Sequence, residues 1–220
     1  MRAPVTTTRA CCDRRTAAGL TLVELLVVVA VVAVVLMLAA PSFRGMIETQ
    51  RLRGINAQFV TDVQFIRSEA VSRQEFTGIS FGSNSSRSCY IMHTCGNTIP
   101  TVSAPCLCDC TLATARCTSP AREIRTVDLP QSDGVSLFSV PVGTATDAAN
   151  SVVFDPATGG VISFFPSSIF SGPSASASPL WAETALIGVG TVPSLRTEIG
   201  ALGRPRVCSP NGRVTGVDPC

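Results

Sequence analysis

An apolar run that holds a single carboxylate constrains the fold of this chain more than any other feature. From Leu20 to Ala40 the only charged residue is Glu24. A helix of that length is roughly 31 Å long, about the thickness of a bilayer core. A carboxylate inside such a segment is costly unless a cation neutralises it, so Glu24 is a candidate functional residue.

The residues before the run suggest the orientation of the segment and a possible cation for Glu24. Arg9, Arg14 and Arg15 precede it, which is typical of a cytoplasmic flank. Cleavage after Gly19, where the missing side chain lets a peptidase approach the backbone, would create a new α-amine on Leu20. That amine would lie one helical turn from Glu24 and supply a cation, within the subunit or between neighbours.

Three other interpretations compete with a processed, membrane-inserted helix. A conventional secretory signal has a shorter apolar region without acids. An ordinary single-pass anchor has no reason to hold Glu24 at its edge. A buried helix of a soluble domain does not fit the arginines that precede the run.

The periodicity downstream predicts one long helix followed by strands. Apolar residues recur mostly at three- or four-residue steps as far as Ala70, so we expect a helix from about Leu20 to Gln74, bent but not ended at Pro41. Beyond it, short β-branched and aromatic runs alternate with turn residues. The expected strands are Thr77–Phe81, Ser88–His93, Glu123–Leu129, Val135–Val140, Ser151–Asp155, Gly160–Phe165, Leu186–Gly190 and Arg204–Cys208, with a hairpin turn at 155–160 and a surface loop at 166–180.

The segment Gly19-Leu20-Thr21-Leu22-Val23-Glu24 resembles the class III signal of type IV pilins and type II secretion pseudopilins, with Leu20 where phenylalanine is usual. Among these proteins the chain resembles the GspH/FimT family. The stretches that carry the resemblance are Pro41-Ser42-Phe43, Arg67-Ser68-Glu69-Ala70 and Gly203-Arg204-Pro205-Arg206-Val207-Cys208.

The resemblance implies an α+β, pilin-like fold, in which a long N-terminal transmembrane helix packs on a mainly antiparallel β-sheet domain. It also implies that prepilin peptidase cuts after Gly19 and methylates Leu20, and that Glu24 pairs with the Leu20 amine of a neighbouring subunit. The expected organisation is a prepilin leader (1–19), a transmembrane half-helix (20–40), an amphipathic half-helix (41–75) and a periplasmic β-rich domain (76–220) with a cysteine-rich insertion (89–117).

The cysteines indicate disulfides. The chain has ten, of which Cys11 and Cys12 lie in the leader. The other eight are Cys89, Cys95, Cys106, Cys108, Cys110, Cys117, Cys208 and Cys220. An even number outside the cytoplasm favours disulfides over a zinc site or free thiols, and the spacing Cys-x-Cys-x-Cys is unusual for structural zinc.

The spacing of the cysteines leads to two expectations about how they pair. On an extended strand Cys106, Cys108 and Cys110 share a face, so we expect each to pair with a different distant cysteine. We expect Cys208 to pair with Cys220, which would close a loop of about a dozen residues around Arg213.

The C-terminal arginines are the remaining candidate site. Gly203-Arg204-Pro205-Arg206 matches the Gly-Arg-x-Arg pattern with which FimT-like pilins bind DNA, and Arg213 could add to the patch. Two or three phosphate contacts would give weak, salt-sensitive binding without sequence readout. The alternative is that these arginines solvate a terminal strand and pair with Glu198 or Asp218.

The sequence therefore predicts a minor pilin or pseudopilin rather than an enzyme. His93 is the only histidine, and no serine lies in a recognisable nucleophile motif. The implied partners are other pilin or pseudopilin subunits, prepilin peptidase and the bacterial inner membrane, with no cofactor, metal or small-molecule substrate. The alternative function is DNA uptake through Arg204, Arg206 and Arg213.

Overall fold

The computed structural model describes residues 19, 21–100, 106, 108–140, 151–162, 180–186 and 192–220. The chain divides into two compact units, Met1–Arg44 and Gly45–Cys220. Helix α1, Leu22–Arg73, contributes to both units and continues through Pro41 without ending. It begins two residues later than expected and ends one residue earlier than Gln74, which has a positive φ of 57°.

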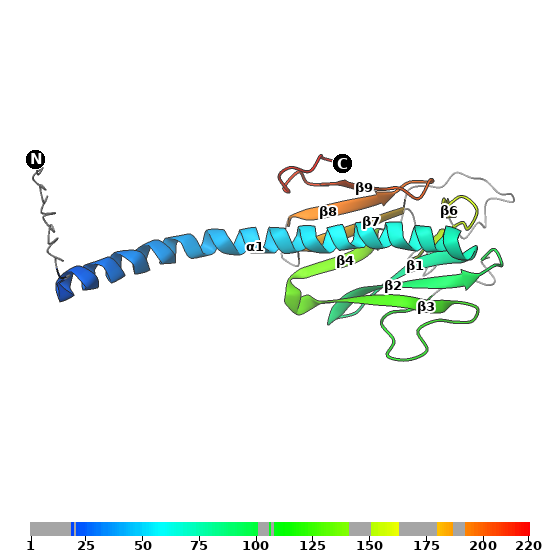
Figure 1. The fold of residues 1–220 in the computed structure, drawn as a ribbon, viewed down its shortest axis with the longest axis horizontal. Coiled ribbons are helices and arrows are strands. Elements are labelled where there is room, and N and C mark those ends of the chain that lie inside the picture. The colour runs from blue at the N-terminus through cyan, green and yellow to red at the C-terminus, as the bar shows by residue number, and fades with distance from the viewer. Residues whose placement is uncertain are drawn as a thin grey trace, which may run out of the picture. The chain divides into compact units, whose positions relative to one another are not determined.

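The second unit contains two antiparallel sheets, which lie beside the second half of α1 (Figure 1). One has the order β3-β2-β1-β5-β6 and the other β4-β7-β8-β9. The strands are β1 Phe76–Ser83, β2 Arg87–Gly96, β3 Arg122–Pro130, β4 Val135–Val140, β5 Ser151–Phe154, β6 Val161–Ile162, β7 Leu180–Leu186, β8 Ser194–Ile199 and β9 Pro205–Cys208, and a 3₁₀ turn, η1 Gln131–Asp133, joins β3 to β4.

Most of the expected strands are confirmed, with three differences. Strand β8 was not predicted from the sequence, although Leu195, Thr197 and Ile199 alternate as buried residues with Arg196 and Glu198. Leu180 begins a strand instead of ending a loop, and the expected strand Leu186–Gly190 overlaps β7 only at Leu186. The rest of that strand, residues 163–165 of another and the loop at 166–179 lie outside the described residues.

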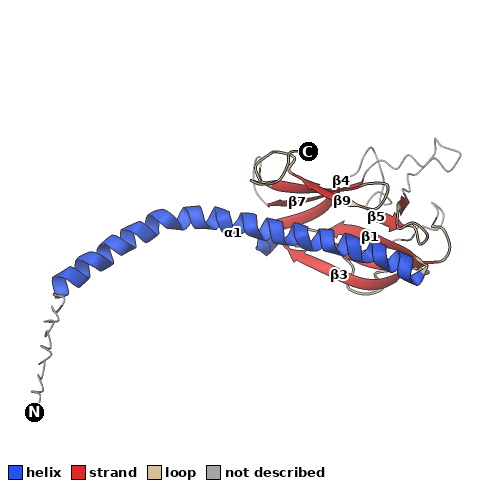
Figure 2. Cartoon of the chain, turned by 45° about the horizontal axis from the view of Figure 1, so that its top comes forward, coloured by secondary structure: helices blue, strands red, loops and turns tan. Residues whose placement is uncertain are grey.

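One face of α1 forms the main core against the sheets. Phe59, Val63, Ile66 and Ala70 are fully buried there. The Phe59 ring meets the Tyr90 ring edge-on with 5.3 Å between centroids, and the Phe81 ring lies 5.7 Å away. Figure 2 shows the second half of α1 beside the strands of both sheets from another direction. The buried residues Phe59, Val63, Ile66 and Ala70 are spaced three or four positions apart, so they lie on one face of α1, and this face covers the sheet.

A buried carboxylate lies at the centre of this interface. Asp62, one turn before Ile66, accepts a hydrogen bond of 2.6 Å from the Tyr90 hydroxyl and forms an ion pair with Arg125 of β3. Burial raises the pKa of the Tyr90 phenol well above its ordinary value, and the hydrogen bond to Asp62 adds to the rise. Tyr90 therefore remains a donor, and Asp62 has a partner for each oxygen.

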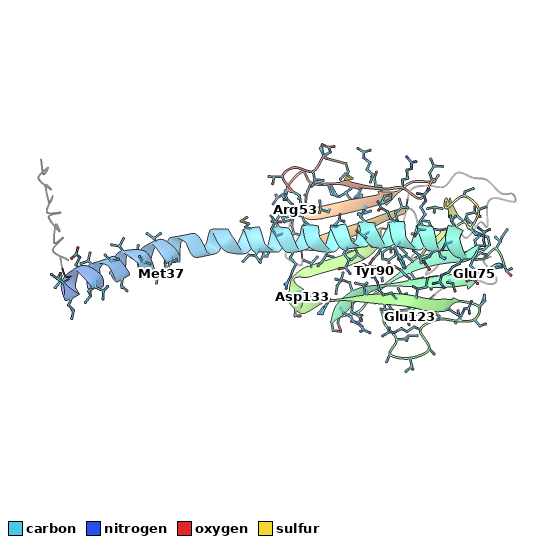
Figure 3. The ribbon with its side chains drawn as sticks, in the orientation of Figure 1. Met37, Arg53, Glu75, Tyr90, Glu123 and Asp133 are labelled. Atoms are coloured by element: carbon cyan, nitrogen blue, oxygen red, sulfur yellow. A yellow bond between two sulfur atoms is a disulfide. The ribbon has the colours of Figure 1, made fainter. Side chains whose placement is uncertain are left out.

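Two arginines hold the helix further towards its N-terminus. Arg51 donates to the backbone oxygen of Asp133 at 2.7 Å, and Arg53 donates to the backbone oxygen of Thr215 at 2.5 Å (Figure 3). The first contact reaches the turn before β4, and the second reaches the loop that follows β9. The segments next to the two edge strands of the second sheet, β4 and β9, are thus both bonded to one turn of α1.

A three-way joint connects α1 to two turns of the sheets. Arg67 Nε donates to the backbone oxygen of Gly159, in the β5–β6 turn, at 2.9 Å. Gly203, in the β8–β9 turn, has a φ of 70°, and a Cβ there would lie 2.3 Å from the same oxygen. Only glycine fits this position, because the backbone is left-handed and the space for a side chain is already filled.

Replacing Gly203 with alanine therefore should cost about 3 kcal/mol or more of unfolding free energy, from the left-handed φ and the clash together. Gly212→Ala is the matched control, because Gly212 has a φ of 62° but no atom within 4 Å of the place that a Cβ would take. We expect that control to lose only about 1 kcal/mol in urea unfolding. Equal losses in the two variants would contradict the joint.

Candidate functional site

The N-terminal segment begins helix α1 with a side-chain N-cap. Thr21 Oγ1 accepts a hydrogen bond of 3.2 Å from the backbone N–H of Glu24, and Thr21 O accepts the first helical bond from Leu25 at 3.1 Å. Thr21 is thus the N-cap, and Glu24 lies in the first turn, where the helix dipole favours a negative charge. This cap was not predicted from the sequence, although the pattern Thr-x-x-Glu is its usual signal.

Glu24 stands at the start of an apolar surface. Every side chain from Leu22 to Met37 is exposed in the first unit. Gly19 is exposed as well, with no atom within 4 Å of where a Cβ would lie. Leu20 is outside the described residues, and so is the expected pair between its amine and Glu24.

Within the described part of the chain, no helix is long and apolar enough to cross a membrane.

The insertion proper, which is the described chain beyond β2 (residue 106 and residues 108–117), lies on the face of the first sheet that α1 does not cover. Its disulfides are Cys89–Cys110, Cys95–Cys106 and Cys108–Cys117. As expected, the cysteines at 106, 108 and 110 each have a different partner, although they do not lie on a strand: only Cys108 forms an isolated bridge, with Cys117. Because residues alternate along β2, Tyr90 and Met92 face the helix while Cys89 and Ile91 face the insertion.

Two arginines add polar contacts to the disulfides of the insertion. Arg87 donates to the backbone oxygens of Cys110 and Thr111, at 3.3 and 3.1 Å, and pairs with Asp128 of β3 at 3.1 Å. Arg116 pairs at 3.3 Å with Glu123, which Figure 3 labels on β3. The insertion is therefore held as a second layer, with a small apolar cluster beneath it.

His93 is buried beneath this layer. Its Nε2 lies 2.9 Å from Ser80 Oγ, and its Nδ1 lies 3.3 Å from Cys106 Sγ and 3.7 Å from Cys95 Sγ. Gly78 leaves room for the ring, since a Cβ there would lie 2.6 Å from His93 Cε1. Burial lowers the pKa of His93 to about 4, partly opposed by the Thr94 backbone, so the ring is neutral at neutral pH.

A disulfide closes a loop at the C-terminus, next to the candidate arginines. Cys208 pairs with Cys220, as expected, with 5.0 Å between Cα atoms. Inside that loop Asn211 donates to the backbone oxygen of Val192 at 2.5 Å and accepts from the Arg213 N–H at 3.2 Å. The loop is therefore fixed to the residues that precede β8.

Arg204, Arg206 and Arg213 are all exposed. Arg206 stands opposite Glu198 in the β8–β9 ladder, and Arg204 precedes β9. Across the described ranges none of the three has a carboxylate oxygen within 4.0 Å, although Glu198 faces Arg206 across the ladder.

Two family models match parts of this chain. A model of the family described as type II transport protein GspH matches residues 57–178, which is more than half of the chain, and a model of the prokaryotic N-terminal methylation motif matches residues 14–40. No curated protein matches the chain.

Two solved structures are similar to this chain. One is the minor pseudopilin EpsH from the type 2 secretion system of Vibrio cholerae, at 11% identity and a TM-score of 0.41, covering 73% of this chain and 98% of that one. The other is the type IV minor pilin FimU of Pseudomonas aeruginosa strain PAO1, at 13% identity and a TM-score of 0.40, covering 72% and 88%.

The buried histidine predicts a pH dependence of stability. Because the pKa of His93 is lowered to about 4 in the folded chain, the unfolded chain binds a proton first as the pH falls below about 6.5. Stability should be full above that pH and fall by about 2 kcal/mol near pH 5. Urea unfolding near pH 7.5 and pH 5 measures this, and His93→Gln should remove most of the difference. An unchanged difference in that variant would assign it to other groups.

Proposed function

The chain belongs to the GspH family of type II transport proteins and is a minor pseudopilin or pilin subunit, and we propose that it is made as a precursor, cut after Gly19 and assembled through Glu24. In this proposal the segment 20–40 anchors the subunit in the bacterial inner membrane. The domain from residue 76 onwards then lies in the periplasm. The assembled structure is a type II secretion pseudopilus or a type IV pilus.

The position of Glu24 carries this proposal. It is the only charge between Leu20 and Ala40, and it lies in the first turn of a helix whose side chains are exposed as far as Met37. When such helices pack together, a carboxylate buried among them needs a cation. The Leu20 amine of a neighbouring subunit would supply that cation, and a subunit in the wrong register would leave Glu24 unmatched.

The partners follow from the same segment. Prepilin peptidase would recognise residues around Gly19 and methylate the amine of Leu20. The other pilin or pseudopilin subunits would contact the apolar surface from Leu22 to Met37. We assign this chain no catalytic step, cofactor or small-molecule substrate, because every role proposed here is a contact between subunits or with the membrane.

Glu24→Ala should leave cleavage and membrane insertion intact and abolish incorporation into filaments, which immunoblots of sheared and membrane fractions would measure. Glu24→Gln is the matched control, because glutamine keeps the size and polarity of the side chain but removes the charge. The bond from the residue 24 N–H to Thr21 Oγ1 is a backbone bond, so both variants keep it. Loss of incorporation in both variants supports charge pairing. Normal incorporation of Glu24→Gln would contradict charge pairing, because a neutral side chain would then be sufficient.

The exposed arginines favour a second candidate function, which is DNA binding during uptake. Arg204, Arg206 and Arg213 are exposed and form no ion pair among the described residues. Each can meet a phosphate, and the joint at Gly203 fixes the turn from which Arg204 and Arg206 extend. Binding through so few phosphates depends on salt and not on sequence.

Arg204→Ala/Arg206→Ala should abolish low-salt DNA binding by the oxidised protein if this second function is correct. Arg73→Ala/Arg122→Ala removes the same charge from residues that pair with Glu69 and Glu75, so we expect it to keep binding. Fluorescence anisotropy at two salt concentrations measures both. No binding by the unmodified protein at low salt would leave the assembly function alone.

A further inference from the structure

Three possible metal ligands converge in the buried space between β2 and the cysteine-rich insertion. They are His93 Nδ1, Cys95 Sγ and Cys106 Sγ, and these atoms lie within 4.8 Å of one another. The three residues are 0%, 1% and 4% exposed. We infer that Cys95 and Cys106, when they are thiols, bind a Zn²⁺ ion together with His93, and that this ion and the disulfide are alternative links between the same two segments.

The arrangement of the imidazole supports a metal site. Nδ1 faces both sulfur atoms, at 3.3 and 3.7 Å, while Nε2 is held by Ser80 Oγ at 2.9 Å. Ser80 Oγ also accepts from the backbone N–H of Cys108 at 3.4 Å. A metal-binding histidine normally has its second nitrogen fixed by such an outer partner, which sets the orientation of the ring.

The protonation states also fit. When Zn²⁺ binds, each of the two thiols loses one proton to solvent. Two thiolates then balance the double charge of the ion, so the buried site is neutral overall, as an apolar surrounding requires.

The ion and the disulfide exclude one another for chemical reasons. The disulfide forms by exchange with an external protein disulfide, which accepts two electrons while the two thiols give up their protons. A thiolate that is bound to Zn²⁺ is not free to attack that disulfide. The zinc site is therefore a property of the reduced chain. It does not depend on the proposed cleavage after Gly19 or on the pairing of Glu24.

The other cysteine pairs provide internal controls. Cys208 and Cys220 lie near the Glu198 carboxylate, but Cys220 is exposed and the single histidine of the chain is elsewhere. Cys108 and Cys117 pair with each other across a short bridge. We expect neither of these pairs to require His93 for Zn²⁺ binding.

The experiment uses the full chain in detergent, reduced with a phosphine under nitrogen, and titrates Zn²⁺ against a chromogenic chelator. We expect a tight site in the reduced chain that is absent from the oxidised chain. His93→Gln should weaken it at least about tenfold, and Cys95→Ser/Cys106→Ser should abolish it. Cys208→Ser/Cys220→Ser should leave it unchanged. With Co²⁺ in place of Zn²⁺, the thiolate charge-transfer absorption should disappear with Cys95 and Cys106.

Several results would overturn the inference. One is equal Zn²⁺ affinity in the unmodified chain and in His93→Gln. Another is a site that persists in Cys95→Ser/Cys106→Ser, which would assign the ion to other cysteines. A reduced chain that has lost its far-ultraviolet circular dichroism spectrum both with and without Zn²⁺ would also overturn it, because the site requires the folded sheet.

Discussion

The contact between one face of α1 and the first sheet is the interaction on which the rest of this domain depends. Phe59, Val63 and Ile66 provide its apolar part, and Asp62 sets its register through Tyr90 and the ion pair with Arg125. A shift of the helix by one residue would turn the carboxylate away from both partners and leave polar groups buried without bonds, at a cost of a few kcal/mol. The polar contacts thereby select a single alignment that apolar packing alone would not.

The same sheet carries a second layer because β2 is buried on both faces. Alternation along the strand gives Tyr90 to the helix and Ile91 to the insertion, and the disulfides from Cys89 and Cys95 hold that insertion in place. A segment with few large apolar residues could not cover a sheet by packing alone. Covalent links therefore replace the burial that a second helix would have provided.

The features that could be predicted from the sequence are those that depend on local pattern. The spacing of apolar residues was enough to place α1 and most strands, and the shared face of Cys106, Cys108 and Cys110 indicated that their partners differ. Contacts between distant segments were not predictable, since nothing near Arg67 or Gly159 shows that they meet. The strand β8 was missed because its alternation includes Thr197, which a hydropathy pattern does not separate from loop residues. At the candidate site, the Thr-x-x-Glu pattern could have predicted Thr21 as a cap but was not used. The lack of ion pairs at the C-terminal arginines could be seen only in the structure.

The four disulfides among the described residues connect cysteines that are close in sequence, with separations of 21, 11, 9 and 12 residues. None of these four joins the early half of the domain to its late half. If the periplasmic domain emerges in order from residue 76 onwards, it could therefore complete the three bonds of the insertion before residues beyond Cys117 emerge, and the last bond would wait only for Cys220. Vectorial export thus poses little risk of mispairing between the two groups of cysteines, because the first group can close before the second group has emerged.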